Sequence, residues 1–134
     1  MSYVEPLTEE NDLPVIKAKE MGMKLDEIKQ SSRWLINGRD GYAIGLLQTL
    51  ERPEQDAIEP HVQWFPWARP RELAQAFEDV MDFFTKTKNV IIVTREKYRS
   101  FYDALVKREK VKYVGMLEKM PVGDVFIYQA VKQC

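Results

Sequence analysis

One stretch closes an apolar segment and opens the most amphipathic helix in the chain: Trp64-Phe65-Pro66-Trp67-Ala68-Arg69-Pro70-Arg71-Glu72-Leu73-Ala74. A strand that turns into a helix presents unpaired N–H groups of the first helical turn, where the helix dipole favours an anion. Arg69 and Arg71 add guanidinium groups that can donate charge-assisted hydrogen bonds to a phosphate. The turn is therefore a candidate phosphate-binding loop, although Pro70 and Glu72 stand where such a loop normally has glycine.

The size and charge of the chain exclude several classes of protein. Its 134 residues, 45% of them hydrophobic, suffice for one core, so we expect a single domain over 1–134 with a flexible acidic segment 1–11. A net charge of −1 gives no general attraction to nucleic acid or to an anionic membrane. No apolar run approaches the roughly 20 residues that span a bilayer. The lone His61 and Cys134 cannot form a zinc site, so we expect a metal-free cytoplasmic protein.

The first half of the chain predicts helices followed by strands. Apolar residues recur at helical spacing through 12–30, with Asn11 as the expected N-cap and Gly22 dividing the segment into two short helices. Two apolar runs on either side of Asn37-Gly38 predict a hairpin. A charged loop and a strand over 57–65 follow.

The second half alternates between helices and strands. An apolar stripe predicts a helix over 71–86, with Pro70 suited to its first turn. The β-branched run 89–94 is typical of a strand buried on both faces. A helix over 96–108 and two further strands complete the order α-α-β-β-β-α-β-α-β-β, the strands at 112–117 and 125–131. The strand-helix-strand unit implies a parallel pair and the hairpins imply antiparallel neighbours, so the expected fold is α/β with a mixed sheet.

This order of elements, and the strand-turn-helix of 57–86 above all, resembles the GNAT acetyltransferases over about residues 12–131. The resemblance implies an α+β fold with a mixed central sheet of about six strands and three to four helices; the first strand of the family is weak or missing. In that family a Val-x-Pro-like step precedes Gln/Arg-x-x-Gly-x-Gly/Ala, whose backbone amides hold the pyrophosphate of acetyl-CoA. Trp64 and Pro66 stand at that step, Arg69 matches the first motif position and Ala74 matches the last.

The resemblance implies transfer of an acetyl group from acetyl-CoA to an amine of a small molecule or a protein, without a covalent enzyme intermediate. The implied coenzyme-binding residues are Trp64, Phe65, Arg69, Arg71, Glu72, Leu73, Ala74 and Thr94. Glu72 departs from the central glycine of the motif, because it brings bulk and a like charge towards a pyrophosphate. As an acidic residue in the first helical turn it also stabilises the helix dipole, so enzyme and non-enzyme both stay open.

The resemblance also implies a base and an acid. Glu59 and His61 fall on the same side of the predicted strand and are the two candidates for the base, acting through a water. His61 is alternatively a partly buried, hydrogen-bonded residue without a catalytic role. Tyr102 is the candidate acid, although Leu105 stands at the tyrosine position of the family, and Tyr102 lies on an apolar stripe typical of packing.

A second resemblance gives a different class of function. The segment 61–71 and Lys112-Tyr113-Val114-Gly115 resemble a group of small GNAT-like proteins of tailed bacteriophages, some of them head-assembly or internal virion proteins. It implies an inactive scaffold that binds phage structural proteins in the host cytoplasm or virion. Trp67 is then expected to be exposed as part of a partner surface. A homodimer is compatible with either function.

Overall fold

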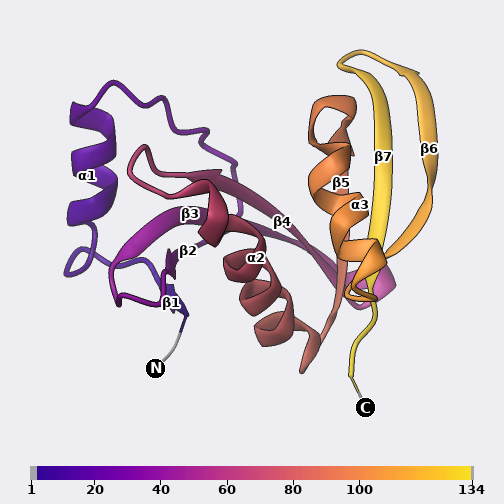
Figure 1. Ribbon diagram of the computed structural model, residues 1–134, viewed down its shortest axis with the longest axis horizontal. Helices are drawn as coiled ribbons and strands as arrows, with labels where there is room; N and C mark the ends of the chain where they lie inside the picture. Colours follow the sequence, from indigo (N-terminus) through magenta and orange to yellow (C-terminus); the bar gives the residue numbers. More distant parts are fainter. Residues whose placement is uncertain (1–2, 134) are drawn as a thin grey trace. The chain divides into compact units, whose positions relative to one another are not determined.

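The computed structural model describes residues 3–133 as a mixed, mostly antiparallel sheet with three α-helices (Figure 1). The seven strands follow the order β1-β2-β3-β4-β5-β7-β6, and β4 pairs with β5 in parallel. The strands are β1 (Val4–Pro6), β2 (Ser32–Asn37), β3 (Ala43–Arg52), β4 (Ala57–Trp64), β5 (Asn89–Arg95), β6 (Lys112–Met120) and β7 (Gly123–Ala130). The helices are α1 (Leu13–Glu20), α2 (Pro70–Thr85) and α3 (Arg99–Lys107), with 3-10 turns at Pro53–Gln55 and Glu96–Tyr98. The predicted mixed α/β fold is confirmed.

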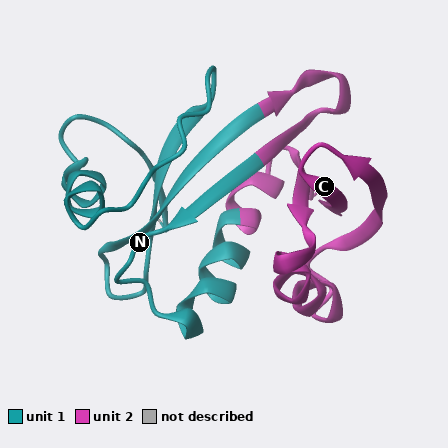
Figure 2. Cartoon of the chain, turned by 90° about the horizontal axis from the view of Figure 1, so that it is seen from above, with its two compact units in different colours: residues 1–50, 60–80 teal, residues 51–59, 81–134 magenta. Residues whose placement is uncertain are grey.

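The chain forms two compact units, coloured separately in Figure 2. Unit 1 comprises Met1–Leu50 and Pro60–Val80, and unit 2 comprises Glu51–Glu59 and Met81–Cys134. Both units contribute strands to the sheet.

The core of unit 1 lies between α1 and one face of the β2–β3 hairpin. Val15 and Ala18 of α1 pack against Leu35 and Leu46, which are directly paired across the two strands. Ile44 lies on the other side of the hairpin, where it lines a pocket together with residues of α2. A register shift between Ile36 and Asn37 accompanies this change of side.

The core of unit 2 lies between α3 and the strands β5, β7 and β6. Leu105 of α3 is fully buried, as are Ile92 of β5 and Tyr128 of β7. The hydroxyl of Tyr128 donates a 2.7 Å hydrogen bond to the Asp103 carboxylate, which attaches α3 to β7. Figure 1 shows α3 running alongside β7.

The hairpin and α2 agree with the sequence prediction. Gly41 adopts a φ of +86° in the hairpin turn, a conformation that residues with a Cβ rarely adopt. Pro70 is the first residue of α2, where the missing N–H would have no intrahelical partner in any case. The parallel pairing of Ala57 with Asn89 confirms the predicted parallel strand-helix-strand unit.

The first strand was not predicted, and it lies in the segment that was expected to be flexible. Val4 pairs with Ile36 and Pro6 with Trp34, so β1 extends the sheet beyond β2. The Val4 side chain is 3% exposed, and the Leu7 N–H donates to the Arg33 carbonyl at 3.0 Å. Burial of one apolar side chain and the backbone pairing together order the segment.

The prediction of a second short helix within 12–30 is wrong, because only Leu13–Glu20 is helical there. Gly22 follows the helix with a φ of +88°. The expected N-cap is wrong as well: Asp12 occupies that position without a side-chain hydrogen bond, while the Asn11 side chain accepts from the Thr8 N–H at 2.7 Å.

Two glutamine side chains hold the segment after Gly22 in an extended conformation. Gln63 accepts from the Asp26 N–H at 2.8 Å and donates to the Lys24 carbonyl at 3.1 Å. Gln48, which is 2% exposed, accepts from the Ile28 N–H at 3.1 Å and donates to the Asp26 carbonyl at 2.6 Å. These bonds satisfy backbone groups that a helix would otherwise pair, and so they override the helical periodicity.

Strand β5 is not buried on both faces as expected. Val90, Ile92 and Thr94 are buried, whereas Val93 is 40% exposed. The alternation is that of a strand with one covered face.

Replacing Gly45 by alanine should destabilise the protein. A Cβ at position 45 would lie 2.9 Å from Cε3 of Trp64, so the indole must move from its packed position. We expect the free energy of unfolding, measured by urea denaturation, to fall by about 1–3 kcal/mol.

Gly115→Ala is the matched control, because a Cβ there meets nothing within 4 Å. Its free energy of unfolding should change by less than about 0.5 kcal/mol. Equal effects of the two substitutions would contradict the close packing of Trp64 on Gly45.

Candidate functional site

The turn between β4 and α2 is held against β3 by hydrogen bonds. The Phe65 N–H donates to the Ile44 carbonyl at 2.9 Å, and the Trp67 indole N–H donates to the Ala43 carbonyl at 2.7 Å. Phe65 is 2% exposed, and its ring stacks at 4.9 Å from that of Trp67. The Lys17 ammonium lies 4.9 Å from the centre of the Trp67 ring on the side of α1. Trp67 is thus half-buried rather than exposed, contrary to the expectation for a partner surface.

Glu72 binds the start of its own helix. Its Oε2 accepts a hydrogen bond from the Arg69 N–H at 3.3 Å, and the Glu72 N–H donates to the Arg69 carbonyl at 2.9 Å. Arg69 therefore occupies the N-cap position and Glu72 the third helical position, as in one half of a capping box. The carboxylate stands at the helix end where the dipole favours an anion.

The two arginines of the turn remain available to a ligand. Arg69 and Arg71 are both exposed. Within residues 3–133 neither guanidinium makes a hydrogen bond or an ion pair. The turn can therefore offer two free cations beside the start of α2.

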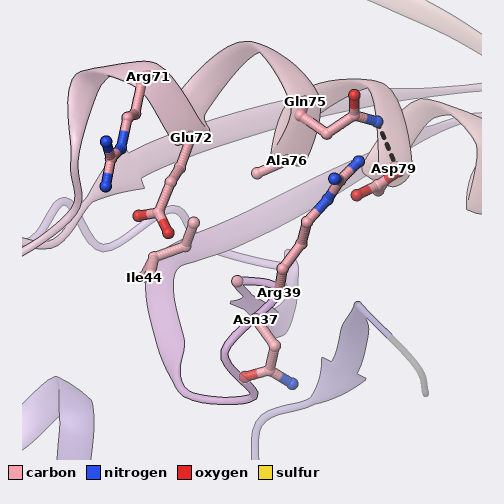
Figure 3. Close-up of a pocket in the computed structure, with 9 residues that line it drawn as sticks. Asn37, Arg39, Ile44, Arg71, Glu72, Gln75, Ala76 and Asp79 are labelled. Atoms are coloured by element: carbon pink, nitrogen blue, oxygen red, sulfur yellow. Dashed lines mark hydrogen bonds between the residues drawn. The ribbon is translucent and has the colours of Figure 1, made fainter.

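A pocket of about 290 Å³ opens beside this helix start, between the β2–β3 turn and α2. Figure 3 shows Arg39 reaching from the turn towards α2, and the Glu72 carboxylate pointing towards Ile44. The lining residues are Asn37, Gly38, Arg39 and Ile44 from the hairpin and Arg71, Glu72, Gln75, Ala76 and Asp79 from α2. Sequence analysis missed Arg39, Gln75 and Asp79, since only the folded hairpin brings Arg39 to the helix.

The other predicted coenzyme-binding residues fall in both units. Trp64 ends β4, while Leu73 and Ala74 lie half-buried in α2, all three in unit 1. Thr94 lies in β5 of unit 2 and is 8% exposed. Unit 1 therefore holds all of the predicted coenzyme-binding residues except Thr94.

The two candidate bases both lie in β4 but differ in their surroundings. Glu59 is 7% exposed and accepts a 3.0 Å hydrogen bond from Nε of Arg52, with which it forms an ion pair. His61 is half-buried and lies in the same unit as the turn before α2. Arg52 was not singled out in the sequence, because its role depends on pairing with a residue of the neighbouring strand.

Tyr102 of α3 lies within an aromatic cluster of unit 2. Its ring centre is 5.1 Å from that of Phe101 and 5.5 Å from that of Tyr128. Burial raises the pKa of Tyr102 well above its usual range, and the neighbouring Tyr98 and Tyr128 raise it further. The raised pKa makes this hydroxyl a weaker acid than that of an ordinary tyrosine, which is likewise protonated at neutral pH.

Two further observations concern metals and membranes. Within residues 3–133 no group of three or more His, Cys, Asp or Glu side chains is arranged to hold a metal ion. In the same residues no helix combines the length and apolar character needed to cross a bilayer.

The fold is that of GNAT acetyltransferases. A spermidine N-acetyltransferase SpeG chimera from Vibrio cholerae and hSSAT superposes with a TM-score of 0.68 at 14% identity, covering 96% of this chain and 95% of that one. A GNAT-family acetyltransferase from Bacillus anthracis gives a TM-score of 0.56 at 13% identity, covering 94% and 76%. An acetyltransferase from Salmonella typhimurium that modifies the N-terminal serine of ribosomal protein L7/L12 gives 0.58 at 14% identity, covering 77% and 64%. No protein-family model and no curated protein matches the sequence.

The raised pKa of Tyr102 predicts how stability depends on alkaline pH. The unfolded chain ionises this tyrosine near its ordinary value of 10.0, whereas the folded chain keeps the proton. Stability from this group is complete below pH 10 and is lost as the pH rises above it, by up to about 1.4 kcal/mol per pH unit. Tyr102→Phe should remove this part of the decline in the free energy of unfolding, measured by urea denaturation at about pH 9.5 and at about pH 11.

Tyr42→Phe serves as the control, because Tyr42 is 40% exposed. It should leave the alkaline slope of the free energy of unfolding unchanged. An unaltered slope in Tyr102→Phe would show that its hydroxyl titrates normally.

Proposed function

We propose that this protein is an N-acetyltransferase that takes an acetyl group from acetyl-CoA and transfers it to an amine. The observation that carries the proposal is the start of α2, where a strand-turn-helix of the GNAT fold presents two unpaired guanidinium groups, Arg69 and Arg71. A pyrophosphate is the group that this combination of helix dipole and arginines suits best.

The loop fits the pyrophosphate in part. Pro70 lacks an N–H, so the later amides of the first turn and the two arginines must supply the donors. The Glu72 carboxylate already accepts from the Arg69 N–H, so it competes with the phosphate for that donor and repels its charge. The proposal therefore includes a coenzyme affinity that Glu72 weakens.

Acetyl-CoA supplies a thioester whose carbonyl carbon an amine nitrogen can attack. The amine must first lose a proton, and we assign its acceptance, through a water, to His61. Glu59 is the less suitable base because Arg52 already engages its Oε2. Tyr102 is the proposed donor of the proton that the departing thiolate takes up.

The amine acceptor is proposed only as a class. Spermidine is the substrate named for one structural neighbour, and it is the first amine to assay. The alternative of an inactive assembly protein came from the resemblance of the segments 61–71 and 112–115 to phage proteins, and it implied an exposed Trp67. The indole is instead half-buried and hydrogen-bonded to the Ala43 carbonyl.

Arg69→Ala should weaken the binding of acetyl-CoA in calorimetric titration. Loss of one charge-assisted hydrogen bond to a phosphate predicts an increase in Kd of about tenfold. Glu72→Gln should lower the Kd about threefold, because it removes the like charge and keeps an acceptor for the Arg69 N–H.

Arg33→Ala, an exposed arginine in β2, is the matched control and should bind acetyl-CoA as the unmodified protein does. Absence of binding at about 1 mM acetyl-CoA would reject the proposed function. Unchanged affinity in Arg69→Ala would exclude this turn from the coenzyme site.

His61→Gln should separate binding from turnover. If His61 accepts the amine proton, the variant should lose about 10²–10⁴-fold in kcat for spermidine, measured as thiol release. The Kd for acetyl-CoA should stay the same. Equal kcat values for the unmodified protein and His61→Gln would exclude His61 as the base and leave Glu59 as the candidate.

A further inference from the structure

The pocket beside α2 contains charged groups that the proposed function does not use. Arg39 comes from the β2–β3 turn and Asp79 from the third turn of α2, and both lie outside the coenzyme loop. Asn37 and Gln75 add amide groups to the same lining. Polar groups that line one pocket indicate a ligand with matching polar groups.

The cationic side of the pocket is unpaired. Arg39 and Arg71 are exposed, and within residues 3–133 neither side chain forms a hydrogen bond or an ion pair. A guanidinium presents a planar fork of N–H donors that matches the two oxygens of a carboxylate. One group of the ligand is therefore an anion.

The anionic side keeps free acceptors as well. Oδ1 of Asp79 accepts from the Gln75 amide at 3.2 Å, and Oε2 of Glu72 accepts from the Arg69 N–H. The second oxygen of each carboxylate has no hydrogen bond within the residues that the structure describes. A second group of the ligand is therefore a hydrogen-bond donor, and an ammonium suits two carboxylates best.

The arrangement of these charges favours a short ligand. Arg39 and Asp79 line the same pocket (Figure 3), so one cavity offers an anion-binding and a cation-binding group. The positive charges of Arg39 and Arg71 also equal in number the negative charges of Glu72 and Asp79. A ligand that carries both charges close together meets this balance, whereas a simple anion leaves the carboxylates opposed to it.

The remaining lining sets the size and character of the rest of the ligand. Ile44 and Ala76 give the pocket an apolar portion, and its volume is about 290 Å³. A Cβ at position 38 would lie 3.4 Å from Cγ2 of Ile44 and 3.7 Å from Oε1 of Glu72. Gly38 thus leaves open space between the apolar portion and the carboxylate.

We propose that this pocket binds a small zwitterion of the α-amino-acid class with an aliphatic side chain. The carboxylate of the ligand binds Arg39, its ammonium binds Asp79, and its side chain lies against Ile44. The two contacts that the proposal assigns, Arg39 and Asp79, lie outside the proposed coenzyme site, while the pocket shares Arg71 and Glu72 with it.

Calorimetric titration of the whole protein with L-leucine tests the proposal. We expect a Kd on the order of 1 mM or below. N-acetyl-L-leucine lacks the ammonium and isoamylamine lacks the carboxylate. Each should therefore bind at least about tenfold more weakly than L-leucine. No heat from L-leucine at about 10 mM, a concentration well above that Kd, overturns the proposal. So does inorganic phosphate that binds as tightly as L-leucine, because the pocket is then a plain anion site.

Three variants assign the contacts. Arg39→Ala and Asp79→Asn should each raise the Kd for L-leucine about tenfold, whereas the exposed controls Arg33→Ala and Asp82→Asn should not change it. Gly38→Ala should weaken the binding of L-leucine more than the binding of free glycine. The added methyl group lies against Ile44, where the side chain of the ligand is placed. Equal affinity in Arg39→Ala overturns the assignment of the site.

Acetyl-CoA binding is measured on the same variants to keep the two proposals separate. Arg39→Ala should bind acetyl-CoA normally, and Arg69→Ala should bind L-leucine normally. Failure of one ligand to bind then leaves the other proposal standing. Loss of both ligands in Arg39→Ala, with its circular dichroism melting curve unchanged, would contradict two independent sites.

Discussion

The attachment of the β4–α2 turn to β3 is the constraint on which both proposed sites depend. The Phe65 N–H and the Trp67 indole N–H donate to consecutive carbonyls of β3, at Ile44 and Ala43. Bonds from a backbone and a side chain to neighbouring residues fix both the position and the direction of the turn. The start of α2 is thereby held beside the hairpin that supplies Arg39, and the same fixed turn presents Arg69 to solvent.

Glu72 shows how the loop keeps its shape without a bound phosphate. In a glycine-containing loop the ligand itself satisfies the first helical N–H groups. Here the side chain of the third helical residue does so for the Arg69 N–H. The Arg69 N–H is therefore already paired in the free protein, and a coenzyme has to compete with an internal carboxylate for it.

Local chemistry made much of the fold predictable. The apolar stripe and Pro70 predicted α2 to within one residue at each end, and Asn37-Gly38 placed the hairpin turn. The extended segment after Gly22 was missed because its partners, Gln48 and Gln63, are distant in sequence and polar. No local pattern shows that a glutamine will pair with the backbone of a distant loop.

The candidate site was predictable only where it is continuous in sequence. Arg69, Arg71 and Glu72 follow one another along the turn, so their chemistry could be read directly. Arg39 and Asp79 are separated by the two strands β3 and β4 and by most of α2, and only folding brings them to one pocket. The roles of Glu59 and His61 remain predictions, as does the coenzyme contact of Thr94.

The two glutamines also bear on which positions of this chain can vary. Gln48 and Gln63 bind backbone N–H and carbonyl groups of residues 24–28, and these four bonds do not depend on the side chains of those residues. Gln48 also accepts a 3.2 Å hydrogen bond from the Ser31 hydroxyl. Substitutions should therefore be tolerated at exposed positions of the segment such as Lys24 and Glu27. Substitutions of the two glutamines should destabilise the protein, since an apolar replacement leaves backbone groups unpaired. The residues that fix the path of this loop therefore lie in β3 and β4 rather than in the loop itself.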